Sequence, residues 1–315
     1  MIFLVLPLIR PFGAPSPEGK AFDCDYERTK PMGIYSDVLL TVDYDRTLTA
    51  YDSTIPERNL EAIRYFMENG GAFTVNTGRS LSMTKVFIDK VPVNVPLLLY
   101  NGSAAYDPKE GKLSFMHEIQ MDMWDTVREL IATFPHLTVE IQGIDAHYNF
   151  IEDPKFDALC ENCKCAHALA PMGSDLGPFL KFTLYGAFHD NTIAGLFEAT
   201  PEELAEMDAA EALLNEKYGD KCEIFRAATR IIDCHAKGVS KNRSARELQQ
   251  RLGRKILVCV GDANNDIPML EGADFSFVPS DAILADRFPN VCPCGEGAVA
   301  DVIYKKIPEI LKNMA

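Results

Sequence analysis

Residues 36–49, SDVLLTVDYDRTLT, join a short apolar run to two carboxylates that follow it directly. A short apolar run closed by polar residues is typical of a strand that is buried on both faces. Asp43 and Asp45 then stand two positions apart, where like charges repel each other. The stretch therefore predicts a buried strand with a polar site at its carboxyl end.

Strand and helix patterns alternate on both sides of a long interruption. A helix, a strand, a second helix and a third strand are expected over 55–71, 72–80, 80–91 and 95–107. The alternation resumes as helix, strand, helix and strand over 240–253, 255–266, 267–273 and 274–279. Such alternation is the signature of a parallel sheet with crossover helices. The sequence predicts an α/β fold with a doubly wound parallel sheet.

The interruption reads as an inserted α+β domain. It combines predicted helices at 121–134 and 201–219 with strand patterns at 136–151, 177–188 and 222–235. We place this cap domain at 113–228 and the core domain at 32–112 and 229–315. Residues 1–31 are expected to be an extension or a misassigned start, with an uncleaved anchor as the alternative. Their apolar stretch, IFLVLPLI, is much shorter than the ~20 residues that span a bilayer.

Composition and charge exclude several classes of protein. Apolar residues make up 47% of the chain and charged residues 24%, as in globular proteins. Nine cysteines without a regular framework indicate reduced thiols and a cytoplasmic protein. The net charge is −15, and residues 113–228 hold 7 Lys and Arg against 21 Asp and Glu, a net −14. So acidic a segment argues against nucleic acid as a partner, and no membrane partner is expected.

Four polar clusters fall near the ends of the predicted core elements: Asp43/Asp45, Asn76–Arg79, Lys237/Lys241 and GDANND at 261–266. The carboxyl ends of parallel strands meet in one crevice, so these clusters should converge there. Three or four carboxylates in one crevice require a hard cation, and oxygen ligands of this kind suit Mg²⁺. Each cluster alone would be an ordinary turn or surface residue, but their joint occurrence predicts a site.

The same four clusters resemble the motifs of the haloacid dehalogenase superfamily of phosphohydrolases. The matching segments are DYDRT, NTGR, the lysine of GVSKN and GDANNDIPML, and the position of the insert resembles the Cof-type subgroup (subfamily IIB) with its α+β cap. The resemblance covers roughly residues 34–311. It implies a Mg²⁺-dependent phosphatase that acts on a small phosphorylated metabolite, with sugar monophosphates as the expected substrates, through an aspartyl-phosphate intermediate.

The resemblance also implies a role for each site residue. Asp43 is the expected nucleophile and Asp45 the general acid and base. The metal is expected to bind Asp43, the carbonyl of Asp45 and Asp262, with Asp266 orienting them from behind. Thr77, through its hydroxyl and its own N–H, and Lys241 are expected to bind the phosphoryl oxygens. The remaining expected substrate contacts are Gly78, Arg79, Asn101 and Asn265.

Three positions depart from the family pattern or leave a choice. Arg46 stands where the family has Gly, so either the local backbone tolerates Arg or the turn differs. Asn242 replaces the Gly that follows the motif lysine, and Asn also tolerates the left-handed conformation. Lys237 is a rival for the lysine role, but Lys241 is preferred because it precedes a helix.

A cysteine-rich segment, CENCKCAH at 160–167, could hold zinc through Cys160, Cys163, Cys165 and His167. Its spacing is tighter than in usual zinc motifs and no second cluster supports it, so reduced thiols in a cap loop are expected.

Competing functions are a phosphosugar mutase of the same superfamily, a phospho-acceptor without turnover and a catalytically silent binder. The acidic cap disfavours substrates with a second phosphate, provided that its carboxylates face the substrate rather than the outside. The alternative places them on the outer face, chiefly along 202–220. The sequence does not define the oligomeric state.

Overall fold

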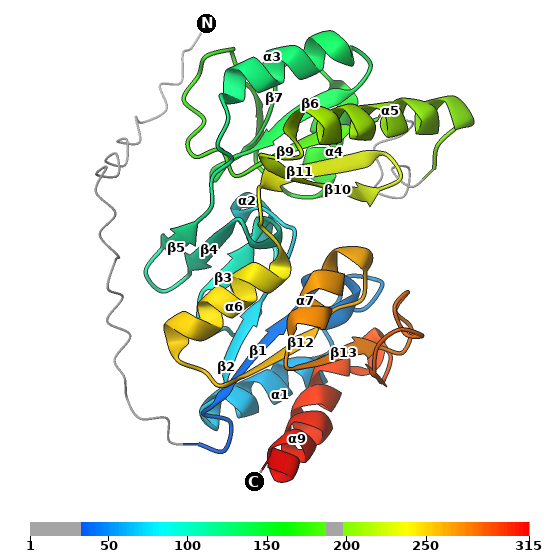
Figure 1. The fold of residues 1–315 in the computed structure, drawn as a ribbon. Coiled ribbons are helices and arrows are strands. Elements are labelled where there is room, and N and C mark those ends of the chain that lie inside the picture. The colour runs from blue at the N-terminus through cyan, green and yellow to red at the C-terminus, as the bar shows by residue number, and fades with distance from the viewer. Residues whose placement is uncertain (1–32, 187–197, 315) are drawn as a thin grey trace, which may run out of the picture.

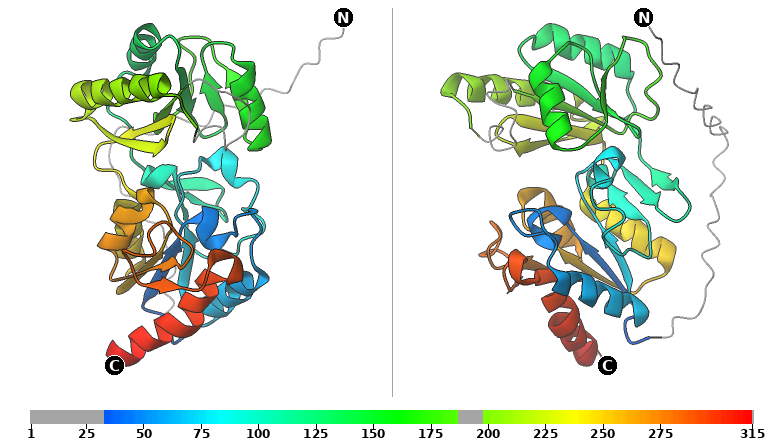
Figure 2. Two further views of the ribbon diagram at one scale, coloured as in Figure 1. Left: turned by 90° about the vertical axis from the view of Figure 1, so that its right-hand side faces the viewer. Right: turned by 180° about the vertical axis from the view of Figure 1, so that it is seen from behind.

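The computed structural model describes residues 33–186 and 198–314, so the predicted extension at 1–31 lies outside the described residues. A core carries a second layered unit, the cap, at one end (Figures 1 and 2). The core sheet is parallel and has the strand order β14-β13-β12-β1-β2. Its strands are β1 (Val38–Val42), β2 (Ala72–Val75), β12 (Ile256–Val260), β13 (Phe275–Pro279) and β14 (Asn290–Val291).

Helices cover both faces of the core sheet, which confirms the predicted doubly wound fold (Figure 1). The core helices are α1 (Glu57–Glu68), α2 (Leu81–Thr84), α6 (Lys241–Leu252), α7 (Ile267–Gly272), α8 (Ala298–Asp301) and α9 (Ile307–Met314). Short helical turns are η1 (Tyr44–Leu48), η2 (Tyr100–Gly102), η4 (Asn264–Asp266), η5 (Cys294–Glu296) and η6 (Val302–Lys306).

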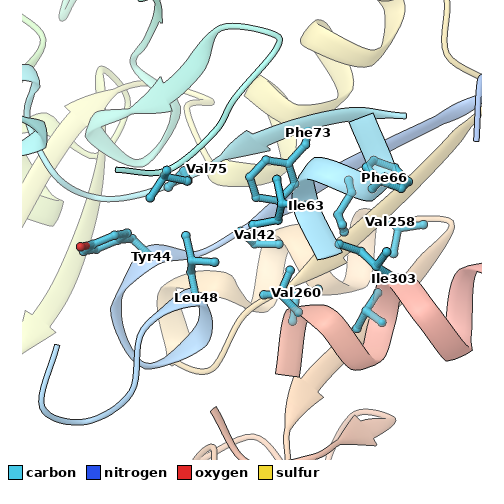
Figure 3. Close-up of a cluster of buried hydrophobic side chains, with 14 of the residues drawn as sticks. Val42, Tyr44, Leu48, Ile63, Phe66, Phe73, Val75, Val258, Val260 and Ile303 are labelled. Atoms are coloured by element: carbon cyan, nitrogen blue, oxygen red, sulfur yellow. The ribbon is translucent and has the colours of Figure 1, made fainter. Parts of the chain in front are cut away.

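The alternation of side chains along β1 explains how its apolar run fills two cores. Val42 belongs to a cluster with Ile63 and Phe66 of α1 and Ile303 of η6 (Figure 3). Leu39, three positions before Val42 in β1, points the other way, into a cluster that contains residues of α6 and α7. Successive strand residues face opposite sides of a sheet, so only a strand covered on both sides needs apolar residues throughout.

A small antiparallel sheet extends the core toward the cap. It consists of β3 (Leu97–Leu99), β4 (Ala104–Asp107) and β5 (Lys112–Met116). A parallel bridge between Asn76 and Leu98 joins β3 to the end of β2. This contact brings the turn after β2 beside the turn after β3, which positions the residues of both turns at one site.

The cap is a six-stranded sheet in the order β10-β11-β9-β6-β7-β8, with helices packed against it (Figure 2). Its strands are β6 (Thr138–Gln142), β7 (His147–Asn149), β8 (His167–Leu169), β9 (Lys181–Tyr185), β10 (Cys222–Ala228) and β11 (Ile231–Ala236). Its helices are α3 (Met123–Thr133), α4 (Pro154–Asn162) and α5 (Pro201–Tyr218). Apolar residues from one face of the sheet pack against α3 and α5.

The cap differs from the predicted range 113–228 at both ends. The predicted end after residue 228 separates β10 from β11, which pair with each other as an antiparallel hairpin. Because β11 also pairs with β9, the cap sheet continues to Ala236. At the other end, β5 pairs with β4 and therefore continues the sheet of the core.

The helix predicted over 80–91 is also shorter than expected, since α2 ends at Thr84. The Thr84 hydroxyl donates to the carbonyl of Leu81, and the N–H groups of Phe87 and Ile88 both return to the carbonyl of Thr84. Side-chain hydrogen bonds of this kind compete with helix propagation. Among residues 33–186 and 198–314, no helix is long and apolar enough to cross a bilayer.

Candidate active site

Each of the four predicted polar clusters contributes at least one residue to a crevice at the carboxyl ends of the core strands. Asp43 follows β1, Asn76 follows β2 and Asp262 follows β12, and these three strands are neighbours. Lys241 is the first residue of α6, and its carbonyl accepts a hydrogen bond of 2.8 Å from the side-chain amide of Asn76. The crevice therefore collects residues that lie up to about 220 positions apart in the chain.

Three carboxylates form the centre of this crevice. One oxygen each of Asp43, Asp262 and Asp266 lies within 4.8 Å of the other two. Burial raises the pKa of Asp43 well above its usual range against the opposing charge of Lys241, and burial and Asp266 raise the pKa of Asp262 to about 7. Excess buried negative charge with only oxygen donors is the environment that a hard divalent cation neutralises. The residues present thus fit the predicted Mg²⁺, with Asp43 and Asp262 as candidate ligands.

Lys241 supplies the positive charge inside this cluster. Its ammonium donates to Asp43 Oδ1 at 2.5 Å and to Asp266 Oδ1 at 2.7 Å, and the residue is only 1% exposed. These two carboxylates outweigh the effect of burial and raise its pKa above the ordinary value. Lys237, in contrast, is exposed and pairs with Glu223 and the carbonyl of Gly219. The geometry favours Lys241 over Lys237.

Asp266 holds the backbone of the GDANND turn in place. Its second oxygen accepts the N–H groups of Asp262 and Ala263 at 2.9 and 3.1 Å. Gly261 permits this close approach, since a Cβ there would stand 2.6 Å from the Cβ of Asp266. Both oxygens of Asp266 are therefore occupied within the protein.

The side chain of Asp45 lies outside the carboxylate cluster and is bound to Arg79. The guanidinium donates from Nε and Nη2 to the two oxygens of Asp45, at 2.9 and 2.7 Å. Arg79 also lies over the ring of Tyr44, 5.0 Å from its centre. The group of Asp45 that is predicted to bind the metal is its backbone carbonyl, and this contact stays a prediction. A carboxylate held in this fork has to leave Arg79 before it can transfer a proton to a substrate.

Arg46 adopts the left-handed backbone conformation that favours glycine, with φ 56° and ψ 11°. The turn is therefore retained with a strained Arg, which decides between the two alternatives left open by the sequence. Its N–H donates to Thr49 Oγ1 at 3.1 Å, and its guanidinium lies 5.3 Å from the centre of the Tyr51 ring. Asn242 does not need the left-handed conformation that Asn tolerates, because this residue lies inside α6 and its φ is negative.

The turn after β2 corrects one predicted role. The N–H of Thr77 donates to the carbonyl of Leu98 at 2.9 Å, so it is not available to a phosphoryl oxygen. The Thr77 hydroxyl accepts from the N–H of Arg79 and keeps its own proton to donate. The N–H of Gly78 makes no hydrogen bond within residues 33–186 and 198–314. The N–H of Gly78, and not the N–H of Thr77, is therefore the candidate hydrogen-bond donor to a phosphoryl oxygen.

Asn101 and Asn265, two of the predicted substrate contacts, lie beside the turn that contains Gly78. A Cβ at Gly78 would lie 2.8 Å from Oδ1 of Asn101, so the turn needs glycine where it meets η2. The Asn101 amide is 3.2 Å from Nε2 of the buried His235 in β11, which ties the core to the cap. Asn265 is exposed and lies 3.5 Å from Asn101. Thr77, Gly78, Asn101 and Asn265 thus lie in one group.

A cavity of about 180 Å³ lies between the core turn and the polar face of the cap sheet. Gly78 and Arg79 line it from the core, and Glu140, Gln142, Lys181 and Asp233 line it from the cap. The ammonium of Lys181 pairs with Asp233 at 2.7 Å, and both are buried. Figure 1 shows the short helix α2 beneath this face of the cap sheet.

The sequence analysis missed these cap residues, although a signal was present. Glu140 and Gln142 alternate with Val139 and Ile141 in β6, and Lys181 and Thr183 alternate with Phe182 and Leu184 in β9. Period-two alternation of this kind separates a polar face from an apolar one. Glu140, Thr183 and Asp233 are also register partners across three strands.

The structure places a different histidine beside the cysteines. His147, Cys160 and Cys165 come together, whereas the predicted His167 lies near Asp157 at 3.8 Å. His147 and His167 are register partners in β7 and β8.

Comparisons with known proteins agree with this architecture. A model of the haloacid dehalogenase-like hydrolase family matches residues 40–283. A 5-amino-6-(5-phospho-D-ribitylamino)uracil phosphatase of Bacillus subtilis is 20% identical over 75% of this chain and 83% of its own length. An HMP-PP phosphatase of Yersinia enterocolitica is 25% identical over 83% of this chain and 92% of its own length.

Solved structures show the same fold. A haloacid dehalogenase-like hydrolase from Bacteroides thetaiotaomicron superposes with a TM-score of 0.71 at 18% identity, over 85% of this chain and 98% of its own. A haloacid dehalogenase-like hydrolase from B. subtilis reaches a TM-score of 0.68 at 16% identity, over 85% and 99% of the two chains. At these identities the likeness concerns the fold alone.

Proposed function

Because this chain belongs to the haloacid dehalogenase-like hydrolase family, we propose that it is a Mg²⁺-dependent phosphatase of small phosphorylated metabolites. The single observation that carries the proposal is the buried cluster in which Lys241 bridges Asp43 and Asp266 beside Asp262. Two of the relatives are named as phosphatases. A purely structural ion pair would not need a third carboxylate in the same buried space.

Asp43 is the proposed nucleophile. Its free oxygen attacks phosphorus and forms an aspartyl-phosphate, while the bond from phosphorus to the leaving-group oxygen breaks. The ammonium of Lys241 stays beside Asp43 and offsets the negative charge of the phosphoryl group. The Thr77 hydroxyl and the Gly78 N–H are positioned to donate to the phosphoryl oxygens. Water then attacks phosphorus, releases phosphate and restores the Asp43 carboxylate.

Asp43, the carbonyl of Asp45 and Asp262 would hold the metal. When bound, Mg²⁺ neutralises charge on the phosphoryl oxygens and on the carboxylates around them. Asp266 keeps the backbone of Asp262 in place through its two accepted hydrogen bonds. Thr47 donates to Asp262 Oδ1 at 3.1 Å and fixes the orientation of this carboxylate.

Asp45 is the proposed acid and base. It protonates the leaving oxygen and afterwards takes a proton from the attacking water, a role worth about 10²–10⁴-fold in rate. Arg79 now holds both oxygens of Asp45, so the substrate must draw Arg79 away when it binds. A phosphoryl or hydroxyl oxygen at the mouth of the cavity is a suitable new partner for this guanidinium.

The proposed substrates are sugar monophosphates or similar molecules with a neutral, hydroxyl-rich leaving group. Carboxylate, amide and ammonium groups line the cavity, and its cations Arg79 and Lys181 are paired with Asp45 and Asp233. Once Arg79 has turned to the reacting end of the substrate, a second phosphate would therefore find Lys181 still paired with Asp233. This arrangement disfavours the mutase alternative. A phospho-acceptor without turnover would need no cavity for a leaving group.

The proposal is tested with an aryl phosphate and with a panel of phosphosugars, nucleotides and cofactor phosphates. The wild-type enzyme should hydrolyse a subset with added Mg²⁺ and lose activity with excess chelator. Asp43→Asn should remove turnover, while Glu202→Gln on the exposed face of α5 serves as a matched acid-to-amide control. Substantial hydrolysis by Asp43→Asn would contradict the assignment, and so would the absence of hydrolysis across the whole panel.

A further inference from the structure

Three potential metal ligands meet on the cap side of the cavity, although they come from different segments. His147 lies in β7, Cys160 in α4 and Cys165 in the loop before β8. One nitrogen or sulfur atom of each residue lies within 4.8 Å of those of the other two, and all three residues are buried. Ligand atoms of a tetrahedral zinc site with these residue types stand about 3.5–3.8 Å apart, so shifts of about 1 Å would close the site.

Glu140 prepares the histidine for a metal. Its Oε1 lies 2.6 Å from Nδ1 of His147, and its other oxygen accepts from Gln142 and Tyr185 at 2.8 and 3.1 Å. Metal-binding histidines almost always donate their second ring N–H to a carboxylate, a backbone carbonyl or water, which leaves the other nitrogen for the metal. Nε2 of His147 now lies 2.6 Å from the Ser80 hydroxyl, a contact that a metal would replace.

The Sγ atoms of Cys160 and Cys165 lie within 4.8 Å of each other, close enough for both to reach one metal ion. The thiolate is the form of cysteine that binds metals. Cys163 lines the same cavity but does not belong to the cluster of three ligands.

We propose that His147, Cys160 and Cys165 bind Zn²⁺, with a fourth position that faces the cavity. One imidazole and two thiolates are ligands that zinc favours, and two thiolates balance the charge of the ion. Three protein ligands with one open position are typical of zinc sites that bind water or a further ligand rather than of closed structural sites. The cavity supplies this access, because all three ligands line it.

This site is separate from the carboxylate cluster of the core. Asp43, Asp262 and Asp266 offer only oxygen, which suits Mg²⁺, whereas the cap site offers nitrogen and sulfur. It also replaces the expectation that the cysteines of 160–165 serve only as reduced thiols.

Cobalt titration of the full-length, untagged protein tests the proposal. The protein is first reduced and stripped of metal with a chelator, and Co²⁺ is then added. We expect a thiolate-to-cobalt charge-transfer band that Zn²⁺ abolishes by competition. Cobalt at the carboxylate cluster cannot give this band, so the result does not depend on phosphatase activity.

Variants then assign the ligands. Cys160→Ser and Cys165→Ser should each lose or strongly weaken the band, while Cys163→Ser and His167→Ala serve as matched controls and keep it. Glu140→Gln should retain the band and weaken metal binding by about 10–100-fold, as expected of a positioning residue. Circular dichroism checks that each variant is folded.

Alkylation of the cysteines in the wild-type protein tests the proposal even if the serine variants do not fold. Zn²⁺ should protect Cys160 and Cys165, but not Cys163, from alkylation as followed by mass spectrometry. The proposal is overturned if the reduced protein shows no charge-transfer band with excess Co²⁺, or if the band persists unchanged in both serine variants. Equal alkylation of the three cysteines with and without Zn²⁺ would also overturn it.

Discussion

The buried ammonium of Lys241 is the residue on which the charge balance of the crevice depends. Replacing it with Met leaves Asp43 and Asp266 buried without a cation. We expect Lys241→Met to lower kcat/KM by about 10²–10³-fold. We also expect a loss of about 3–5 kcal/mol in the free energy of unfolding, since a buried charge pair is broken on one side.

Lys237→Met is the matched control, because this exposed lysine pairs only near the protein surface. Its free energy of unfolding should stay within about 0.5 kcal/mol of the wild type. Steady-state kinetics and urea denaturation measure both variants. If Lys237→Met were the more damaged enzyme, the assignment of the lysine would be wrong.

Arg46 provides a test of backbone strain at a single residue. Its φ of 56° suits glycine and is costly for a β-branched side chain. We expect Arg46→Gly to be more stable than Arg46→Val by about 1–2 kcal/mol. Both variants lose the contact with Tyr51, so this contact does not contribute to their difference in urea denaturation. Equal stability of the two variants would show that the turn relaxes without strain.

The position of a site residue could be predicted where the residue directly follows or begins a regular element. Asp43 and Lys241 follow or begin a regular element, so the pattern of strands and helices places them. The Asp45–Arg79 pair could not be predicted, because it depends on side-chain directions across two turns. The same limit explains the choice of His167 over His147, since strand pairing brings His147 to the cysteines from outside their own segment.

At the scale of elements, Asp274 joins α6 to the end of the core sheet. It accepts from the guanidinium of Arg246 and from the N–H of Leu257 in β12. Burial opposes ionisation, but these hydrogen bonds outweigh it and hold the pKa of Asp274 below its usual value. A lowered pKa in the folded state means that the ionised form stabilises the fold.

The stability difference between wild type and Asp274→Asn should therefore depend on pH in a defined direction. The contribution is fully present above the ordinary pKa of aspartate, about 3.9, and is lost as the pH falls through the lower pKa of the folded state. Urea denaturation at a series of pH values measures it. A difference between the two proteins that grows below about pH 4 would contradict the prediction.

Helices and strands were predicted well where the sequence shows a long apolar pattern. They were predicted less well where the pairing of strands decides to which domain a strand belongs. The alternation of strands and helices gave the core sheet, because each buried strand is an apolar run. The end of the cap was misplaced, because nothing in the sequence of 222–235 shows that both of its strands pair within one sheet. Hairpin partners are a property of the fold and not of the segment.

At the scale of the whole molecule, the position of charge matters more than its sum. Acidic residues of α5, including Glu202 and Asp208, are exposed. This exposure agrees with the alternative that places the acidic residues on the outer face of the cap, away from the substrate. Inside the cavity, Lys181 is held by Asp233. The predicted preference for monophosphates therefore rests on paired cations in the cavity rather than on repulsion by the acidic cap.

We expect Asp233→Asn to release Lys181 and to raise kcat/KM for a hexose 1,6-bisphosphate relative to a hexose 6-phosphate. The effect should be larger at low salt, where charges are less screened. Glu202→Gln removes the same charge on the outer face and should leave the ratio unchanged. If the ratio of the two kcat/KM values changed equally in both variants, the preference would be explained by the total negative charge of the cap and not by the pairing of Lys181.

The pairing of β1 with β12 has a consequence for biosynthesis. Val42 and Val260 are register partners, yet they are 218 positions apart in the chain. At about 5–20 residues per second, β12 leaves the ribosome roughly 10–40 seconds after β1. During this interval β2 covers one edge of β1, and the other edge of VLLTV stays open. We expect nascent chains that stop after the cap but before β12 to aggregate or to be held by chaperones, although the cap itself is already synthesised.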